Sequence, residues 1–284
     1  MPPPTEKSAV SDGGVSNSDL VLYVVNNGVA LITLNNPLRN NAWSAELGDR
    51  FFDRLDQAAL DPDVRSIVVT GAGKSFCPGA DMKGLDSNAH EGNGIEATGL
   101  RRYLTHPLTI PKPIIGAING ACAGFGFVLA SMFDIRFAAR DAKFTTSFAR
   151  RGVAAEWAIT LLLPQLIGLQ RALDLLLSGR VFTADDALTY GYLLEVVERT
   201  DVVDVALNYA GELATFSSPT AMAAIRRQVY DDLGNNLKTA RESSMAYMRL
   251  ISQYPDFAEG VDHYVEGRPP RFPPLAPDFK TAEY

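Results

Sequence analysis

The residue whose setting most suggests chemistry is Glu156. It is the only charged residue between Gly152 and Gln170, in the stretch GVAAEWAITLLLPQLIGLQ. A carboxylate among apolar neighbours is costly unless it has a partner or its pKa rises, and a raised pKa suits a general acid/base. The arginines that precede it, Arg150 and Arg151, leave a structural ion pair open as the alternative.

A glycine-rich stretch, GAGKSFCPGADMK at residues 71–83, could place backbone N–H groups against a ligand. It contains Gly-Lys-Ser, but a phosphate-binding P-loop would need a glycine where the chain has Val68. Small residues after a strand allow N–H groups to point into a cleft instead of bonding to a neighbouring strand. An ordinary glycine-rich turn is the alternative.

A second set of N–H donors is suggested by INGACAGFGFVLA at residues 118–130. The pattern predicts a strand that ends at Asn119-Gly120 and a helix that begins near Gly124. The unpaired N–H groups in the first turn of a helix stabilise developing negative charge. The stretch is not a dinucleotide fingerprint, because Leu129 occupies the place of the third glycine. Glycines kept for close helix packing are the alternative.

Other kinds of catalytic site find little support in the sequence. The three histidines, His90, His106 and His263, lack the spacing of a metal site, and no G-x-S-x-G nucleophile motif occurs. Each histidine is therefore interpreted as a surface residue or a hydrogen-bonded structural one. We expect no metal and no permanently bound cofactor.

The composition is that of an acidic globular chain. It has 284 residues, 46% of them hydrophobic, a formal net charge of −7 and a pI of about 5.1. One large domain or two small ones are expected, and the charge disfavours nucleic acid and anionic membranes as partners. Cys77 and Cys122 offer neither a disulfide framework nor zinc-ligand spacing, which is typical of proteins in the cytoplasm.

The two ends of the chain differ from its middle. Residues 1–18 are rich in Pro, Ser, Gly and charge and lack an apolar signal region, so we expect a disordered leader. Residues 19–200 alternate between strand and helix patterns, which predicts an α/β domain. Residues 201–284 read as a helical region with a proline-rich tail, in which Ser218 is a candidate N-cap before Pro219.

The elements that must position the candidate residues can be predicted from hydrophobic spacing. Short β-branched runs indicate strands, and apolar residues three or four apart indicate helices. Ser44 is a candidate N-cap for a helix in which Leu47, Phe51 and Leu55 share a face. The predicted elements are two strands within residues 20–37 around an Asn-Asn-Gly turn, single strands at 65–71, 112–120 and 135–139, and helices at 44–61, 124–134 and 217–233.

Five segments, in this order, resemble the motifs of the crotonase family, also called the enoyl-CoA hydratase/isomerase superfamily. The resemblance covers almost the whole chain after residue 18. The segments are LNNPLRNNAWSAEL, GAGKSFCPGADMK, KPIIGAINGACAGFGFVLASMFDIRFAA, ALDLLLSGRVFTADDALTYGYLLEVV and DFAEGVDHYVEGRPPRF. The resemblance implies a crotonase-like spiral of ββα units, with a helical C-terminal region that forms homotrimers or dimers of trimers.

The same resemblance assigns roles to individual residues. The backbone N–H groups of Ala80 and Phe125 would form an oxyanion hole for the carbonyl of a coenzyme A thioester, the substrate. Two preorganised donors there would stabilise the charge that proton abstraction beside a thioester creates. Residues expected along the substrate path are Asp81, Met82, Lys83 and Gly124, and residues expected near the adenine end of coenzyme A are Leu38, Arg39 and Asn41.

The chain departs from the hydratases of this family at the two positions that carry their glutamates. Val128 and Phe148 occupy those positions here, so water addition by the usual pair is not expected. The position of Glu156 carries an acid in several relatives, and the segment is most similar to the ring-epoxide isomerases of phenylacetate breakdown. Those proteins have aspartate there, followed by a turn of small residues that Trp157 interrupts here.

These features predict an acyl-CoA enoyl isomerase that moves a double bond by a single-base proton shift. Glu156 would remove a proton and return it to another carbon, while Val128, Phe148 and Trp157 line an apolar acyl pocket. Two alternatives stay open. One is an enoyl-CoA hydratase, a lyase, in which Glu156 activates water, and the other is a non-catalytic acyl-CoA binding protein.

Overall fold

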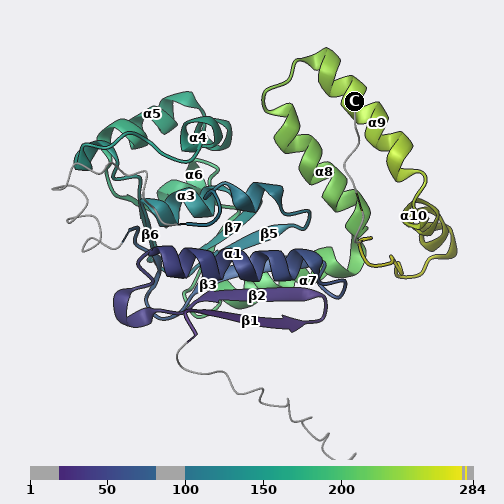
Figure 1. Ribbon diagram of the computed structural model, residues 1–284, viewed down its shortest axis with the longest axis horizontal. Helices are drawn as coiled ribbons and strands as arrows, with labels where there is room; N and C mark the ends of the chain where they lie inside the picture. Colours follow the sequence, from purple (N-terminus) through teal and green to yellow (C-terminus); the bar gives the residue numbers. More distant parts are fainter. Residues whose placement is uncertain (1–18, 81–99, 277–278, 280–284) are drawn as a thin grey trace, which may run out of the picture.

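The computed structural model describes residues 19–80, 100–276 and 279, and its strands form two sheets (Figure 1). The large sheet has the order β1-β2-β3-β5-β7-β10 and the small sheet the order β4-β6-β8-β9. The large sheet comprises β1 Val21–Asn26, β2 Val29–Leu34, β3 Ser66–Gly71, β5 Ile114–Ile118, β7 Ile135–Ala139 and β10 Glu195–Val197. The small sheet comprises β4 Ser75–Cys77, β6 Ala121–Ala123, β8 Lys143–Thr145 and β9 Phe182–Thr183.

Helices of the described residues cover both faces of the large sheet and continue beyond it. They are α1 Ala45–Leu60, α3 Phe125–Ser131, α4 Ile159–Ile167, α5 Leu169–Ser178, α6 Ala184–Thr189, α7 Val202–Phe216, α8 Pro219–Asp232, α9 Leu237–Ile251 and α10 Pro255–Glu266. Short 3-10 turns are η1 Pro37–Arg39, η2 His106–Thr109 and η3 Ala149–Arg151.

The first two strands form the hairpin that the Asn-Asn-Gly turn predicted. β1 and β2 pair antiparallel with Asn26 opposite Val29. The turn residues Asn27 and Gly28 have φ of 48° and 79°, the left-handed values that a two-residue hairpin turn requires. The predicted strands at 65–71, 112–120 and 135–139 are confirmed as β3, β5 and β7, which pair with one another in parallel.

The parallel strands are covered on both faces. Every residue of β3 and β5 is buried, which explains why their sequences are continuous apolar runs and do not alternate. Val68 of β3 clusters with Ala206 and Ala210 of α7, whereas its neighbour Ile67 clusters with Phe51 of α1. The large sheet therefore lies between α1 and α7 (Figure 1), and α7 is a core helix although it follows residue 200.

Each of three parallel strands of the large sheet is followed by a short strand of the small sheet. β3 leads to β4, β5 to β6 and β7 to β8, and β6 leads directly into α3. This repetition is the expected spiral of ββα units. Glycine is required where the sheets meet, because a Cβ on Gly120 would lie 2.0 Å from the carbonyl oxygen of Lys74.

Both predicted helix caps are confirmed. The N–H of Leu47 donates to Ser44 Oγ at 3.2 Å, and the N–H of Ala221 donates to Ser218 Oγ at 3.0 Å. Each bond satisfies one of the N–H groups that the first turn of a helix leaves unpaired. The caps fix where α1 and α8 begin.

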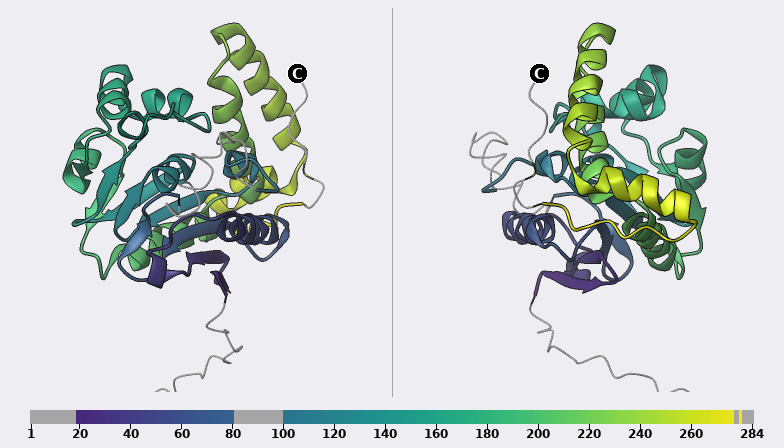
Figure 2. Two further views of the ribbon diagram at one scale, coloured as in Figure 1. Left: turned by 60° about the vertical axis from the view of Figure 1, so that its left-hand side comes forward. Right: turned by 90° about the vertical axis from the view of Figure 1, so that its right-hand side faces the viewer.

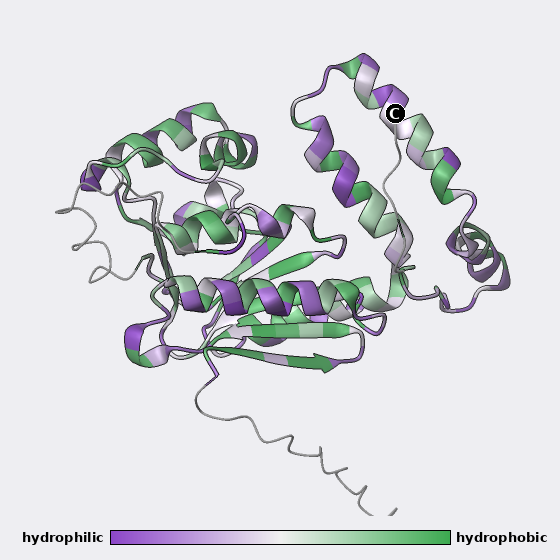
Figure 3. Ribbon diagram, viewed as in Figure 1, coloured by the Kyte–Doolittle hydropathy of each residue, from purple (hydrophilic) through white to green (hydrophobic). Residues whose placement is uncertain are grey.

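The helices after α7 extend away from the sheets, as two further views show (Figure 2). Hydrophobic and hydrophilic residues are mixed along α8, α9 and α10 (Figure 3). Several large apolar side chains of α9 and α10 are exposed, namely Met245, Met248, Phe257, Val261, Tyr264 and Val265. No helix within the described residues is both long enough and apolar enough to span a bilayer.

Candidate active site

Three parallel strands of the small sheet bring the candidate residues to one edge. β4, β6 and β8 pair in parallel, and the chain reaches Ala80 after β4 and Phe125 after β6. Phe148 and Glu156 follow β8. Because the carboxyl ends of parallel strands meet at the same edge, these residues lie on one side of the small sheet, where α/β proteins commonly bind ligands.

The turns that carry Ala80 and Phe125 are in direct contact. Gly79 and Gly124 have φ of 109° and 49°, in the region that favours glycine. A Cβ on Gly79 would lie 3.1 Å from the carbonyl oxygen of Ala123 and 3.7 Å from the Cα of Gly124. The positive φ therefore favours glycine at both positions, and the approach of the two backbones is tight at Gly79.

The N–H groups of Ala80 and Phe125 are the donors that this arrangement can offer. Trp43 and Ala80 form an isolated parallel β-bridge, in which the N–H of Trp43 donates to the carbonyl of Gly79 at 2.7 Å. Phe125 is the first residue of α3, so its N–H has no acceptor within the helix. Among the backbone hydrogen bonds that the described residues form in turns, loops and helix caps, none has the N–H of Ala80 or Phe125 as its donor.

The two glycines of Gly-Phe-Gly have different tasks. A Cβ on Gly126 would lie 2.1 Å from the carbonyl oxygen of Cys77, so α3 packs directly on β4. Gly124 instead supplies the positive φ of the turn before the helix. Close packing, one of the two interpretations of these glycines, is therefore present, and it fixes where the N–H of Phe125 lies.

Glu156 lies in the loop before α4 and is partly buried. Burial is the main cause that raises the pKa of its carboxyl above the value in water, and no cation of the described residues contributes. The guanidinium of Arg150 donates through Nε to the carbonyl of Ser178 at 2.6 Å. The ion-pair alternative therefore finds no support at Arg150, and the carboxyl has the environment of a general acid/base.

Among the described residues, the indole of Trp157 is the one neighbour that counteracts this rise in the pKa of Glu156. Its Nε1 is near enough to favour the charged carboxylate, but the geometry is not that of a hydrogen bond, and Nε1 has no hydrogen-bond partner within the described residues. The ring of Trp157 lies 6.4 Å from the ring of Tyr103, centroid to centroid. Tyr103 is an aromatic neighbour that no sequence pattern had indicated.

The two positions at which hydratases would carry glutamate are part of the apolar core. Val128 and Phe148 are buried in the same hydrophobic cluster, and Trp157 packs against that cluster. Phe148 begins the η3 turn and accepts the N–H of Val153 on its carbonyl at 3.2 Å. Neither position could bind water as a carboxylate would.

The residues expected near coenzyme A are placed unevenly. Asp81, Met82 and Lys83 lie outside the described residues, whereas Leu38 and Arg39 belong to η1, with Leu38 fully exposed. Asn41 is buried. Its Oδ1 accepts the N–H of Asn36 at 2.8 Å, and its Nδ2 donates to the carbonyls of Ala72 and Ser75 at 3.0 and 2.8 Å. The Asn41 amide is thus used inside the protein, and it ties η1 to the turn between β3 and β4.

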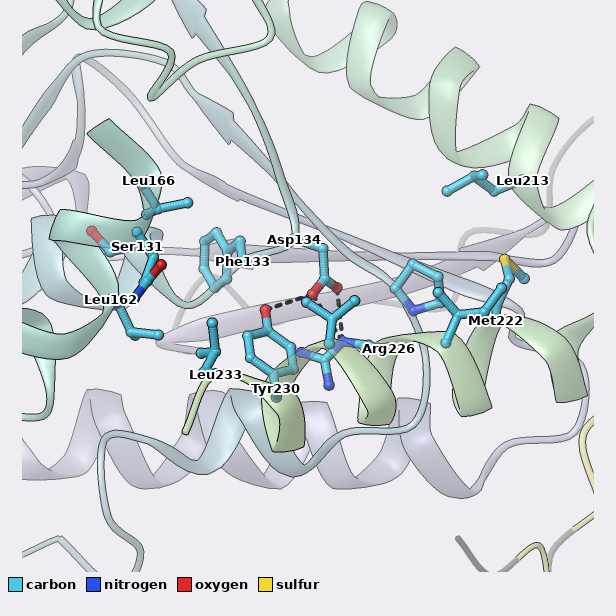
Figure 4. A pocket seen from close by; sticks show the side chains of 14 residues that line it. Ser131, Phe133, Asp134, Leu162, Leu166, Leu213, Met222, Arg226, Tyr230 and Leu233 are labelled. Carbon is cyan, nitrogen blue, oxygen red and sulfur yellow. Dashed lines mark hydrogen bonds and ion pairs between the residues drawn. The ribbon is translucent and has the colours of Figure 1, made fainter. Parts of the chain in front are cut away.

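A groove of about 530 Å³ lies away from these residues, between α4 and α8 (Figure 4). At its base, Arg226 Nε donates to Asp134 at 2.8 Å, and the hydroxyl of Tyr230 donates to Asp134 at 2.8 Å. The carboxylate of Asp134 is therefore already engaged as an acceptor by two side chains of α8. The described residues also contain no cluster of His, Cys, Asp and Glu that could hold a metal ion.

Comparison with known proteins shows which family the chain resembles. The family model for enoyl-CoA hydratase/isomerase matches residues 24–274. The chain is 33% identical to the 1,2-epoxyphenylacetyl-CoA isomerase of Escherichia coli, over 89% of this chain and 98% of that protein. It is also 33% identical to enoyl-CoA hydratase ACTT3 of Alternaria alternata, over 86% of this chain and 83% of that protein.

The fold agrees with these matches. The crystal structure of an enoyl-CoA hydratase from Polaromonas sp. JS666 superposes with a TM-score of 0.83 at 27% identity, over 89% of this chain and 99% of that one. The sequence matches and the fold therefore indicate the same known family. The chain belongs to the enoyl-CoA hydratase/isomerase family, the crotonase superfamily.

Proposed function

We propose that this family member is an acyl-CoA isomerase that moves a double bond with a single base. The observation that carries the proposal is the environment of Glu156, a partly buried carboxyl without a cationic partner among the described residues, while Val128 and Phe148 are buried and apolar. The similarity to 1,2-epoxyphenylacetyl-CoA isomerase, which is an isomerase by name, supports the same reaction class.

The proton balance of the reaction needs only one carboxylate. Glu156 removes a proton from a carbon of the acyl chain, and the electron pair moves into the thioester carbonyl to give an enolate. The N–H groups of Ala80 and Phe125 bond to the enolate oxygen, where the charge develops. Protonated Glu156 then returns the proton to another carbon, so the product has the mass of the substrate.

An apolar wall suits this transfer. Water near the protonated carboxyl would exchange with the proton before its return, and water near the enolate would compete with the two N–H donors. Phe148 and Val128 present no polar atom that could hold a water molecule there. Coenzyme A enters as part of the substrate, and the balance calls for no further cofactor.

The proposal is tested with a panel of 2-enoyl- and 3-enoyl-CoA thioesters, following ultraviolet absorbance and product mass together. A shifted double bond at unchanged mass is the expected result. Glu156→Gln should lower kcat about 10²- to 10⁴-fold, the usual contribution of a general base, while substrate binding is retained. Glu212→Gln, a change of the same kind at an exposed position of α7, should leave kcat unchanged.

Two other outcomes would replace this proposal. A product heavier by one water would favour a hydratase in which Glu156 activates water alone, in line with relatives such as enoyl-CoA hydratase ACTT3. Binding of thioesters without turnover across the panel would favour a non-catalytic acyl-CoA binding protein. Full isomerase turnover by Glu156→Gln would remove Glu156 from the mechanism.

We further propose that the protein assembles as a homotrimer or a dimer of trimers. Phe257, Val261, Tyr264 and Val265 are exposed at spacings of four, seven and eight residues along α10. Such spacing puts them on one face of the helix, and an apolar face of this kind is usually covered by another protein surface.

The cytoplasm is the proposed location, since Cys77 and Cys122 are buried free thiols.

A further inference from the structure

The turn after Glu156 has an unusual backbone. Trp157 and Ala158 have φ of 54° and 62°, so two consecutive residues with a Cβ lie in the left-handed region. Glycine is the ordinary residue there, because a Cβ makes this conformation unfavourable. Strain of this kind persists only where the surrounding structure imposes it, and it is found most often at functional sites.

The strained turn connects Glu156 directly to α4. The N–H of Ile159 donates to the carbonyl of Glu156 at 3.2 Å, and the carbonyl of Ala158 accepts the N–H of Leu162 at 3.1 Å as the helix begins. The chain therefore reverses within two residues after the carboxyl-bearing residue. Trp157 follows Glu156 directly in this reversal, and its indole lowers the pKa of the Glu156 carboxyl against the effect of burial.

The two side chains leave complementary groups unused. Nε1 of Trp157 is buried and has no hydrogen-bond partner within the described residues. Buried donors are rarely left unpaired, and each exception calls for an explanation. A carboxylate is an acceptor with several lone pairs, and Glu156 is the charged acceptor that lies next to this donor.

The ring of Trp157 also contacts aromatic and apolar side chains. Tyr103 lies 6.4 Å from it, with an angle of 54° between the ring planes, and the central apolar cluster packs against it.

We propose that Trp157 is a positioning residue for Glu156, whose indole N–H bonds to the charged carboxylate and directs it into the acyl pocket. When Glu156 takes the proton from the substrate the bond weakens, because a neutral carboxyl is a poorer acceptor. The carboxyl is then free to turn toward the second carbon. This inference rests on the proposed role of Glu156 as the proton carrier.

Few other groups could produce the same effect. The ionisable residues on the described elements around Glu156 are Arg150 and Arg151 of η3 and Tyr103, whereas α3 and α4 carry none. Arg150 is bonded to the carbonyl of Ser178. A substitution that keeps the ring of Trp157 and removes only its N–H therefore isolates the proposed contact.

Trp157→Phe is that substitution. The protonation of Glu156 is followed by infrared difference titration, in which subtraction of the Glu156→Gln spectrum identifies the carboxyl band, so no turnover is needed. Loss of a donor to the charged form should raise the titration midpoint by about one pH unit. The acidic limb of kcat/KM for the isomerase should move upward by the same amount, with kcat lowered more than KM is changed.

Tyr103→Phe is the matched control, since it alters the other ring of the pair without removing an indole donor, and its midpoint should equal that of the wild type. An unchanged or lowered midpoint in Trp157→Phe would overturn the proposal. A raised midpoint in a protein that isomerises no thioester would support the contact and refute the proposed function. If Trp157→Phe did not fold, Trp157→Leu, which also lacks the donor, should show the same rise.

Discussion

Glu156 illustrates how a partly buried carboxyl can reduce the stability of the fold that holds it. Burial raises the pKa of its carboxyl, so the folded protein binds a proton there more tightly than the unfolded chain does. Stability from this group is therefore fully present at pH values below the unfolded pKa and is lost as pH rises through the folded pKa. Once ionised, the group opposes folding, and none of the cations among the described residues compensates its burial.

Glu156→Gln should therefore raise the thermal stability at pH 7 while it lowers activity. We expect an increase in Tm of about 2 °C, which roughly 0.5–1 kcal/mol produces in a chain of this size. The gain should disappear in mild acid, because the Glu156 carboxyl of the wild type is then protonated and carries no more charge than the glutamine side chain of the variant. Scanning calorimetry of both proteins at the two pH values measures the difference. A lower Tm for the variant at pH 7 would mean that a cationic partner holds Glu156.

Sequence reasoning at this scale works for residues whose type is surprising in its setting. Glu156 was found because a charge interrupts an apolar stretch, and Val128 and Phe148 because apolar residues stand where a pattern expects acids. Tyr103 was missed because its approach to Trp157 depends on tertiary packing. Asn41 was expected near coenzyme A, and the three internal bonds of its amide were not foreseen, because a buried asparagine has the same sequence pattern as any turn asparagine.

Elements far apart in the chain are joined here by one buried side chain. Arg226 of α8 is 7% exposed and donates to Asp134 and to the carbonyls of Pro107, Leu108 and Ile110. Asp134 in turn accepts the N–H of Ile114 at the start of β5. The helix, the turn η2 and the sheet are therefore connected through a single guanidinium, whose planar group can serve several acceptors at once.

Arg226→Met should destabilise the protein by about 3–5 kcal/mol, because removal of one partner leaves the carboxylate of Asp134 without its cation in a partly buried position. Its neighbour Arg227 pairs with Asp231 four residues on, at 44% exposure, so Arg227→Met should change stability by less than about 1 kcal/mol. Urea unfolding of the two variants gives the comparison. Equal effects would mean that the Arg226 bonds contribute no more than a surface pair.

The elements themselves were largely predictable, whereas their contacts were not. Ser44 and Ser218 marked helix starts because capping is a local interaction, and β3 and β5 were visible as short β-branched runs. The pairing of β4 with β6 joins residues far apart in the chain, and three-residue strands have no pattern of their own. The family resemblance supplied only the expectation that Ala80 and Phe125, which follow these strands, come together at one site.

The boundary between the core and the C-terminal helices lies further along the chain than the sequence pattern indicated. Residues 19–200 were expected to form the core, but α7, after that boundary, covers one face of the large sheet through Val202, Ala206 and Ala210. The helices that extend away begin with α8. Composition changes near residue 218, yet the helical pattern of α7 resembles that of the later helices, so burial against the sheet could not be inferred from periodicity alone.

The exposed apolar face of α10 makes the assembly testable at this scale. If a second copy covers it, light scattering should give three or six times the chain mass of 30.8 kDa. Val261→Asp combined with Tyr264→Asp should lower that mass, because a charge placed in an apolar interface loses its hydration without gaining a partner. Leu60→Asp, at a position of α1 that is 77% exposed, serves as the control and should leave the mass unchanged. A wild-type protein of one chain mass would contradict the proposed assembly, and it would mean that the face of α10 is open to water or serves another partner.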